Sequence, residues 1–279
     1  MEVKKVKAPV RIDFGGGTTD IEPFTYIYGG AVLNATIDKF VTGKIIRTSK
    51  ETHLEYTGEV PTSSGLGTSG VMNLVWLALI SKTKNKKELA DRVYDMEQAM
   101  GLVGGKQDQY AAAFGGINFM KFKKSKVEIN RLKLPTRFVR ELEKRLVLVY
   151  MGKPHFSGHS NKLAIQNLIK GRNKKNLIRI KEIAYEMKKS LEQKKMYKFA
   201  ELMNQETRER DRLHEITIGK SSEDFINKGL KNGAIAAKIC GSGAGGSVLF
   251  FAEDKDKLIK TFKEKVIDFK FEFRGLRYL

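Results

Sequence analysis

Residues 61–70 read PTSSGLGTSG, and the apolar run VMNLVWLALI follows directly at residues 71–80. The first segment holds three glycines, five hydroxyl side chains and no charge. Glycine lets backbone N–H groups come close to an anion, and a helix that begins inside such a loop adds free N–H groups and the positive end of its dipole. The residues alone leave two interpretations open, because the segment fits either a phosphate-binding loop or a turn that caps a helix.

The periodicity outside this loop predicts an α+β protein. Residues 69–81 are apolar on nearly every side, which indicates a buried helix. Alternating side chains predict a first strand in VKKVKAPVRIDF, a hairpin within residues 31–47 and a last strand near residues 267–274. After residue 160 the chain is predicted to be mostly helical, with helices near residues 160–170, 174–193, 196–214 and 221–231.

The composition bounds the class of protein. The chain has 279 residues, of which 41% are hydrophobic, enough for one large or two smaller globular domains. It has a single cysteine, Cys240, no uncharged apolar run of about 18 residues and no apolar signal-peptide core, so we expect a cytoplasmic protein without a membrane span or disulfide framework. The net charge of +20 is spread over predicted helices with acidic residues interleaved, so a nucleic-acid partner is not expected.

Two more glycine clusters stand at residues 15–20 (GGGTTD) and 241–246 (GSGAGG). The segment at residues 61–70 is not a Walker A loop, because no lysine follows its last glycine. The cluster at residues 241–246 satisfies G-x-G-x-x-G, but a predicted strand follows it where a dinucleotide-binding fingerprint requires a helix. By itself it also fits a tight turn between two strands.

Taken in order, three segments resemble the motifs of the GHMP kinase superfamily: APVRIDFGGGTTD (residues 8–20), PTSSGLGTS (61–69) and KICGSGAGGS (238–247). The resemblance spans almost the whole chain. It implies an α+β architecture of two domains, with a ribosomal S5 domain 2-like fold over residues 1–155 and a ferredoxin-like α/β sandwich over residues 156–279.

Further stretches are similar to one branch of that superfamily, the sugar 1-kinases. NATID (34–38) and GGKQDQYAAAFGGINFMKF (104–122) resemble heptose 7-phosphate kinases, and the segments around PVRIDF and SGLGTS resemble fucokinases. The segment MGKPHFSGHS (151–160) departs from the heptose-phosphate kinases, because His155 stands where they tend to carry an arginine. An arginine fork suits phosphate better than a histidine does, so this departure leaves an unphosphorylated sugar open as the acceptor.

The resemblance implies that the chain binds ATP and Mg²⁺. The nucleotide would lie against the loop residues Pro61, Ser63, Ser64, Gly65, Leu66, Gly67, Thr68 and Ser69. The metal would take Glu97 together with the hydroxyl groups of Thr68 and Ser69, since Mg²⁺ prefers hard oxygen ligands. Without the resemblance, Glu97 also fits a solvated residue at the edge of an amphipathic helix.

The same resemblance makes Asp108 the carboxylate that accepts or orients the proton of the sugar hydroxyl, with Arg11 against it. A permanently charged arginine would keep Asp108 ionised and stabilise charge in the transition state. From the residues alone, Asp108 also fits a helix N-cap and Arg11 a surface position on a strand.

The acceptor site is expected around the first and third glycine clusters. Asp13 and Asp20 are candidate ligands of sugar hydroxyl groups, although Asp20 also fits a residue that closes the GGGTTD turn. The basic and polar side chains of Lys106, His155, His159 and Ser160 would surround the far end of the acceptor. The full predicted set is Asp13, Gly17, Thr18, Asp20, Lys106, Gln107, His159, Gly243 and Ala244. Cys240 is expected to be a small buried side chain and not a nucleophile.

The sequence therefore predicts an ATP-dependent kinase that phosphorylates a sugar at its anomeric hydroxyl, with a heptose 7-phosphate or a related sugar as acceptor. Two alternatives remain open: a fucokinase- or galactokinase-like enzyme for an unphosphorylated sugar, and a non-catalytic sugar or nucleotide sensor on the same fold. The expected oligomeric state is a monomer or a homodimer.

Overall fold

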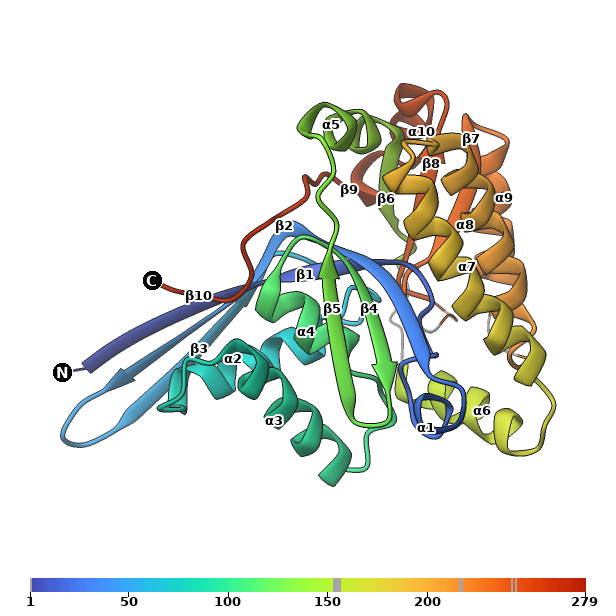
Figure 1. The fold of residues 1–279 in the computed structure, drawn as a ribbon. Helices are drawn as coiled ribbons and strands as arrows, with labels where there is room; N and C mark the ends of the chain where they lie inside the picture. The colour runs from blue at the N-terminus through green and yellow to red at the C-terminus, as the bar shows by residue number, and fades with distance from the viewer. Residues whose placement is uncertain (1, 153–156, 216–217, 242, 244) are drawn as a thin grey trace.

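The computed structural model describes residues 2–152, 157–215, 218–241, 243 and 245–279. Its strands form two antiparallel sheets (Figure 1). The first sheet has the order β10-β1-β2-β4-β5, with β3 paired to β2, and is built from β1 (Glu2–Gly15), β2 (Gly30–Arg47), β3 (Thr52–Gly58), β4 (Ile117–Lys123), β5 (Lys126–Arg131) and β10 (Arg277–Tyr278). The second has the order β7-β8-β6-β9, from β6 (Leu146–Tyr150), β7 (Ala234–Ile239), β8 (Ser247–Ala252) and β9 (Val266–Ile267).

The helices of the described residues cover these sheets. In chain order they are α1 (Phe24–Ile27), α2 (Thr68–Ile80), α3 (Lys86–Ala99), α4 (Gln107–Phe114), α5 (Thr136–Arg145), α6 (Ser157–Ile169), α7 (Lys174–Glu192), α8 (Met196–Asp211), α9 (Gly219–Leu230) and α10 (Lys255–Phe262), followed by a 3₁₀ turn, η1 (Lys263–Lys265). Figure 1 shows α2, α3 and α4 together below the long strands β1 and β2, and α7 and α8 beside the second sheet.

The close approach of α2 to β2 depends on a glycine. A Cβ on Gly43 of β2 would lie 2.6 Å from Cγ1 of Val75 and 2.9 Å from Cδ1 of Leu79. Because Gly43 has no side chain, these two apolar residues of α2 pack directly on the strand. The prediction of a buried apolar helix after residue 68 is confirmed. Because α2 packs on β2, the position of its first turn is fixed relative to the sheet.

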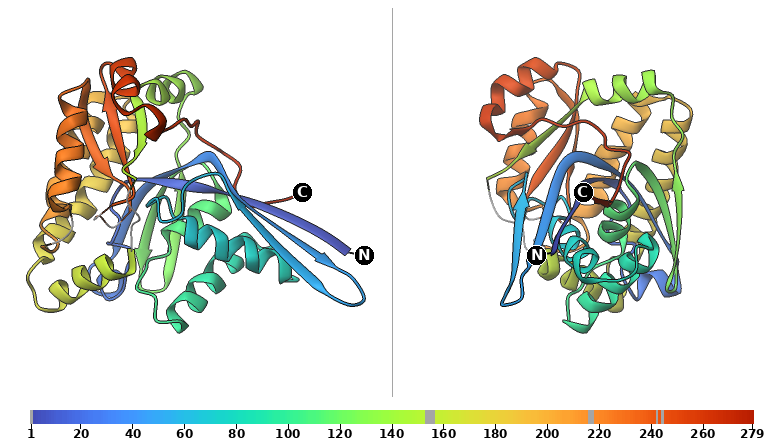
Figure 2. Two further views of the ribbon diagram at one scale, coloured as in Figure 1. Left: turned by 180° about the vertical axis from the view of Figure 1, so that it is seen from behind. Right: turned by 90° about the vertical axis from the view of Figure 1, so that its left-hand side faces the viewer.

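One hydrophobic core joins the two sheets. It contains Phe14 of β1, Leu148 of β6 and Leu249 of β8, and Met187 of α7 lies in the same cluster. Figure 2 shows the outcome from two further sides: the second sheet stands at one end of the long strands, and both chain termini lie near the other end. The α+β class predicted from the sequence is confirmed.

Two predictions about strands are wrong. Residues 31–47 do not form a hairpin but lie in the single strand β2, because β1, β3 and β4 all supply it with partners along its length. Most of the predicted last strand at residues 267–274 is irregular. Between β9 and β10 this segment forms an isolated β-bridge, from Phe271 to Ile37 of β2. It is tied there by the Thr36 carbonyl and hydroxyl, which bond the backbone of Glu272.

The strand pairing also bears on the expected division at residues 155 and 156. β6 ends before that point, yet it pairs with β8 and β9 of the second sheet. By strand pairing the second sheet therefore begins at Leu146, and β10 returns the chain to the first sheet beside β1. None of the helices in the described part of the chain has the length and apolar character that a bilayer crossing requires.

Candidate active site

The loop before α2 is shaped by glycines in the left-handed region. Gly65 has φ +77° and Gly67 has φ +75°. A Cβ on Gly65 would lie 2.4 Å from the carbonyl oxygen of Cys240, and one on Gly67 would lie 3.0 Å from Cγ of Asp108. The two glycines are therefore needed for the turn. They are also needed because Cys240 and Asp108 lie too close to the loop backbone for a side chain to fit without a shift.

The hydroxyl groups of this loop do not cap the helix. The N-cap of α2 is Gly67, which has no side chain, and α2 has no side-chain capping bond within the described residues. The hydroxyl oxygens of Ser64 and Thr68 are buried and have no hydrogen-bond partner within the described residues. Buried polar groups normally find a partner, so the loop fits a polar ligand, and the interpretation as a capped turn does not account for it.

Two adjoining cavities meet at this loop. The first, which we call the phosphate-loop cavity, is lined by Ser63, Ser64, Gly65, Gly67, Thr68 and Ser69, with Arg11, Leu102, Asp108, Gly158, His159 and Gly241. The second, the carboxylate cavity, is lined by Asp13, Gly17, Thr18, Asp20, Glu97, Gln107, Asn161 and Arg210, among others. Arg11, Ser69 and Asp108 line both cavities, so these side chains stand at the border between them.

Arg11 and Asp108 form an ion pair at that border. Nε and Nη2 of Arg11 lie 2.8 Å and 2.7 Å from Oδ1 of Asp108, and Nη1 donates to the carbonyl oxygen of Gly65 at 2.7 Å. Burial by itself would lower the pKa of Arg11, but the Asp108 and Asp13 carboxylates outweigh it and raise that pKa. Arg11 is therefore a permanent cation, and it joins the catalytic candidate Asp108 to the loop.

The helix that carries Asp108 is not capped by it. Its N-cap is Lys106, which makes no capping bond, and Asp108 is the second residue of α4. Of the two interpretations that the sequence left open for Asp108, the structure favours the one that pairs it with Arg11. Arg11 itself is 4% exposed, which contradicts a surface position on its strand.

Glu97 of α3 is a buried carboxylate beside the same border. Its Oε1 accepts from Nδ2 of Asn73 at 2.8 Å, and its Oε2 accepts from the side-chain amide of Gln109. Burial chiefly raises the pKa of Glu97, and nearby Asp108 raises it further, while the Asn73 bond opposes both. The alternative of a solvated edge residue is excluded, because Glu97 is 8% exposed.

The oxygen donors of these residues would suit a magnesium ion that takes further ligands from outside the protein. In the described residues, no group of three or more histidine, cysteine, aspartate or glutamate side chains is arranged to hold a metal by itself. Mg²⁺ is commonly held by one or two carboxylates together with phosphates and water. Glu97, Ser69 and the unpartnered hydroxyl group of Thr68 offer such a partial set.

Asp20 stands out among the carboxylates of the carboxylate cavity. Its pKa is raised to about 7, chiefly by burial. The N–H group of Gln107, which bonds Oδ2 at 3.1 Å, opposes the rise, and the Asp108 and Asp13 carboxylates add to it. A Cβ on Gly105 would lie 1.9 Å from Oδ2 of Asp20, so that glycine makes room for the carboxyl group. Asp20 therefore changes charge near neutral pH inside the cavity.

Several predicted site residues lie elsewhere. Nζ of Lys106 contacts Asp91 at 3.3 Å and the carbonyl oxygen of Ser125 at 3.1 Å, and Lys106 does not line either cavity. The buried side chain of Leu66 belongs to the hydrophobic core. Pro61 is exposed, outside both sets of lining residues.

The remaining predictions concern the second half of the chain. His159 lines the phosphate-loop cavity and not the carboxylate cavity, so its place differs from the expected far end of the acceptor. Gly241 lines both cavities, whereas Gly243 lines neither. Ala244 and His155 lie outside the described residues. Burial raises the pKa of the Cys240 thiol to about 12, which agrees with an inert, buried side chain.

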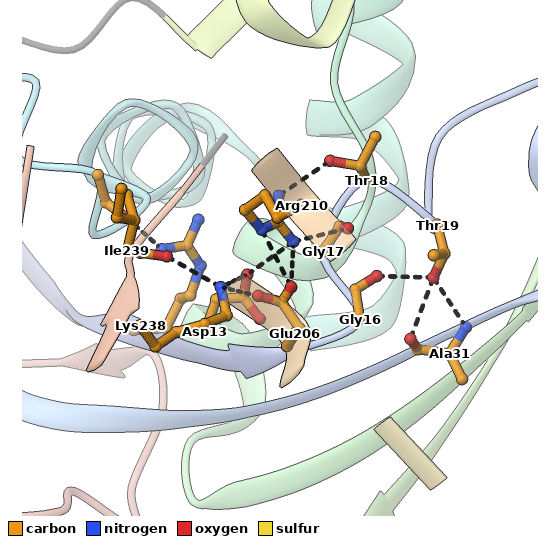
Figure 3. A network of polar contacts seen from close by, with 12 residues as sticks. Asp13, Gly16, Gly17, Thr18, Thr19, Ala31, Glu206, Arg210, Lys238 and Ile239 are labelled. Carbon is orange, nitrogen blue, oxygen red and sulfur yellow. Dashed lines mark hydrogen bonds and ion pairs between the residues drawn. The ribbon is translucent and has the colours of Figure 1, made fainter. Parts of the chain in front are cut away.

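The sequence did not indicate a buried cluster of four charges, drawn in Figure 3, of which Asp13 and Arg210 line the carboxylate cavity. It consists of Asp13, Glu206, Arg210 and Lys238, whose side chains are at most 1% exposed. The available signal was Lys238, a charged residue within the otherwise apolar strand AIAAKIC. Asn73 and Gln109, which hold Glu97, were also missed; Asn73 interrupts the apolar run of α2.

Comparison with known proteins places two family models on the chain. The model described as "GHMP kinases N terminal domain" matches residues 26–116, and the one described as "GHMP kinases C terminal" matches residues 187–266. Together they match more than half of the 279 residues. The N-terminal match includes the loop before α2, Glu97 and Asp108, and the C-terminal match includes Arg210 and Lys238.

Individual proteins are similar over most of the chain. A D-glycero-alpha-D-manno-heptose 7-phosphate kinase of Campylobacter jejuni is 28% identical, and the match covers 99% of each chain. A bifunctional fucokinase/GDP-fucose pyrophosphorylase of Arabidopsis thaliana is 24% identical over 91% of this chain and 30% of its own. The crystal structure of a D-glycero-D-manno-heptose 1-phosphate kinase from Bacteroides thetaiotaomicron has the same fold, with a TM-score of 0.79, 24% identity and coverage of 100% and 99% of the two chains.

Proposed function

The chain belongs to the GHMP kinase family, and within that family we propose that it is an ATP-dependent sugar kinase that phosphorylates an anomeric hydroxyl. The observation that carries the proposal is the Arg11–Asp108 pair at the border of the two cavities. A kinase needs a donor site and an acceptor site that meet at the reacting atoms. The phosphate-loop cavity suits the donor, and the carboxylate cavity suits a polyhydroxylated acceptor.

In the proposed reaction, Asp108 orients the acceptor hydroxyl and accepts its proton as the hydroxyl oxygen bonds to the γ-phosphorus of ATP. The bond between that phosphorus and the bridging oxygen breaks, and ADP leaves with its electron pair. Arg11 contributes a fixed positive charge beside the transferring group. Oδ1 of Asp108 is occupied by Arg11, so Oδ2 is the oxygen that faces the acceptor in this scheme.

The loop residues Ser64, Gly65, Gly67, Thr68 and Ser69 would hold the phosphate groups through backbone N–H groups, hydroxyl groups and the N-terminus of α2. Glu97, Thr68 and Ser69 would hold Mg²⁺, which when bound neutralises charge on the phosphate oxygens. Asn73 and Gln109 keep the Glu97 carboxylate oriented for that role.

Two acceptor classes are supported by different observations. Similarity over 99% of the chain to a heptose 7-phosphate kinase supports a heptose 7-phosphate. An unphosphorylated sugar is supported by the charges of the carboxylate cavity, because Asp13, Asp20, Glu97 and Asp108 line it, while Arg11 and Arg210 are already bonded to carboxylates. Of these two classes we put the heptose 7-phosphate first.

A sugar panel tests the proposal. The purified protein is given ATP and Mg²⁺ with D-glycero-D-manno-heptose 7-phosphate, L-fucose, D-galactose or D-glucuronate, and ADP release is measured by a coupled assay. R-mevalonate serves as a non-sugar control. We expect turnover with one sugar and a product whose ³¹P spectrum places the new phosphate on the anomeric oxygen. No sugar-dependent ADP release, or a phosphate on another hydroxyl, would contradict the proposal.

A further inference from the structure

Arg210 of α8 joins the second half of the chain to the turn of the first glycine cluster. Its Nη2 donates to the carbonyl oxygen of Gly17 at 2.9 Å, and its Nη1 donates to the hydroxyl oxygen of Thr18 at 3.3 Å. Gly17 and Thr18 both line the carboxylate cavity. A side chain far away in the sequence therefore sets the position of that cavity wall (Figure 3).

Arg210 is itself held in place by Glu206, one helical turn earlier. Nε and Nη2 of Arg210 lie 3.0 Å and 2.6 Å from Oε1 of Glu206. The four hydrogen bonds to Glu206, Gly17 and Thr18 engage most of the guanidinium donors. Although Arg210 lines the cavity, most of its donors are bonded to other protein groups. It is therefore suited to hold the protein backbone in place and not to bind an anionic ligand.

The same cluster orients Asp13. Its Oδ2 lies 3.4 Å from Nζ of Lys238 and 3.9 Å from Nη2 of Arg210, and Lys238 in turn lies 3.1 Å from Oε2 of Glu206. With two cations on one side of the carboxylate, its Oδ1 is left buried and without a hydrogen-bond partner in the described chain. Asp13 lines the carboxylate cavity, and a buried carboxylate oxygen without a partner can accept a hydrogen bond from a ligand hydroxyl group.

Such a cluster is a weak source of stability, because burying four charges removes them from water. We propose that Arg210 is a positioning residue for the acceptor: it fixes the Gly17–Thr18 turn and, with Lys238, the orientation of Asp13, so that α8 sets the affinity for the sugar. This inference rests on the proposed sugar-kinase function. It assigns Arg210 no contact with ATP, because Arg210 does not line the phosphate-loop cavity.

The test uses the double variant Arg210→Met/Glu206→Gln. It removes one cation and one anion together, so Asp13 and Lys238 still balance each other and no uncompensated charge is buried. With D-glycero-D-manno-heptose 7-phosphate, or the panel sugar that the wild type phosphorylates, we expect the acceptor KM to rise at least about tenfold, as expected for lost hydrogen bonds to a charged group. The KM of ATP and the affinity for a non-hydrolysable ATP analogue should stay within about twofold.

Two further variants separate positioning from folding. Arg210→Lys keeps the charge but lacks the fork that bonds three partners at once, so its acceptor KM should fall between wild type and the double variant. Arg212→Met is the matched control, since Arg212 follows α8, is largely exposed and pairs only with Glu209 among the described residues. It should leave both KM values unchanged.

The outcomes distinguish the two proposals. A wild-type protein that phosphorylates no sugar overturns the sugar-kinase function and this inference with it. An active wild type and a double variant with an unchanged acceptor KM overturn only the role of Arg210. A double variant in which the ATP KM rises in parallel and the melting temperature falls would show that the cluster is merely structural, which also overturns it.

Discussion

Asp108 illustrates how the site depends on single atoms. Oδ1 receives two N–H groups of Arg11, and the side chain is still 27% exposed at the border of the two cavities. A carboxylate that is fixed on one oxygen and accessible at the other is suited to take a proton from a bound hydroxyl.

Replacement of Asp108 should separate binding from chemistry. We expect Asp108→Asn to lower kcat by about 10²–10⁴, because asparagine cannot accept the proton, while the affinity for an ATP analogue changes little. Asp95→Asn, an exposed change on α3, serves as control and should keep full turnover. Steady-state kinetics and calorimetric titration of both variants measure this, and an Asp108→Asn protein with more than half of the wild-type kcat would refute the role of Asp108.

Asp20 makes stability depend on pH. Its pKa is about 7 in the folded chain against an ordinary value of 3.8, so the folded state disfavours the ionised form. A raised folded pKa means that the full stability is present below about pH 4 and that the Asp20 contribution is lost as pH rises to about 7. Asp20→Asn should therefore be more stable than wild type, by a margin that grows from pH 4 to pH 7 and then levels off.

Urea unfolding of wild type and Asp20→Asn at a series of pH values measures that margin. All other titrating groups are common to the two proteins, so the difference in the free energy of unfolding isolates Asp20. We expect a difference of a few kcal/mol at pH 8 and a smaller one at pH 5, because a tenfold change in the acid dissociation constant on folding corresponds to about 1.4 kcal/mol. A difference that does not vary with pH would contradict the raised pKa.

At the scale of elements, α2 and its loop act as one unit. The helix is held by apolar contacts with β2, so its N-terminus points from a fixed position into the phosphate-loop cavity. The loop is shaped by Gly65 and Gly67, and both approach other parts of the site too closely for a side chain. The long strand β2 supports this arrangement, because β1, which carries Arg11 and Asp13, pairs along it.

Gly65→Ala tests the fit of the loop against Cys240. The added Cβ would lie 2.4 Å from a backbone oxygen, so the loop must shift, and we expect about tenfold or greater loss of affinity for an ATP analogue. Gly101→Ala is a closely matched control: its φ of +74° equals that of Gly65 within a few degrees, but nothing lies within 4 Å of the added Cβ.

Both variants should lose about 1–2 kcal/mol of stability from the left-handed backbone alone. Only Gly65→Ala should lose further stability and nucleotide affinity, which chemical denaturation and calorimetric titration measure. Equal effects of the two substitutions would mean that backbone strain, and not the close approach to Cys240, explains the glycine at position 65.

At the scale of the whole molecule, one large hydrophobic cluster takes residues from both sheets, although their strands pair separately and the second sheet also contributes to a second cluster. Phe14 of β1 packs edge-on against Phe199 of α8 with ring centroids 5.2 Å apart, and against Phe271 of the C-terminal segment at 6.1 Å. The buried charge cluster joins the same two elements, because Asp13 lies in β1 and Arg210 in α8. The border between the two cavities thus depends on contacts between segments from both ends of the chain.

A shared core predicts one cooperative unfolding transition. Phe14→Ala should lower the free energy of unfolding by about 3–5 kcal/mol, as for other large-to-small changes in a core, and should lower the melting temperature of that one transition. Ile169→Ala, at a side chain that is 71% exposed, should change the stability by less than about 0.5 kcal/mol. Two calorimetric transitions, of which Phe14→Ala moves only one, would contradict this prediction.

The sequence by itself determined the features that local chemistry encodes: the α+β class, the three glycine loops in order, the apolar helix after residue 68, and the family to which these motifs belong. It also singled out Arg11, Glu97 and Asp108, because each lies in or near a motif. It could not assign Lys106, whose match to the family pattern gave no information about where its ammonium group points.

Only the tertiary structure decided which of these residues meet. Arg210, Glu206 and Lys238 carry no motif, and they reach Asp13 and the Gly17–Thr18 turn only because the common core brings α8 and β7 against β1. β2 remained one strand because β1 pairs along most of its length, while β4 pairs with its first part and β3 with its second. Local propensity and spacing report on neighbours along the chain, whereas burial, ion pairing and cavity walls are set by long-range packing. The carboxylate cavity is built from such long-range contacts.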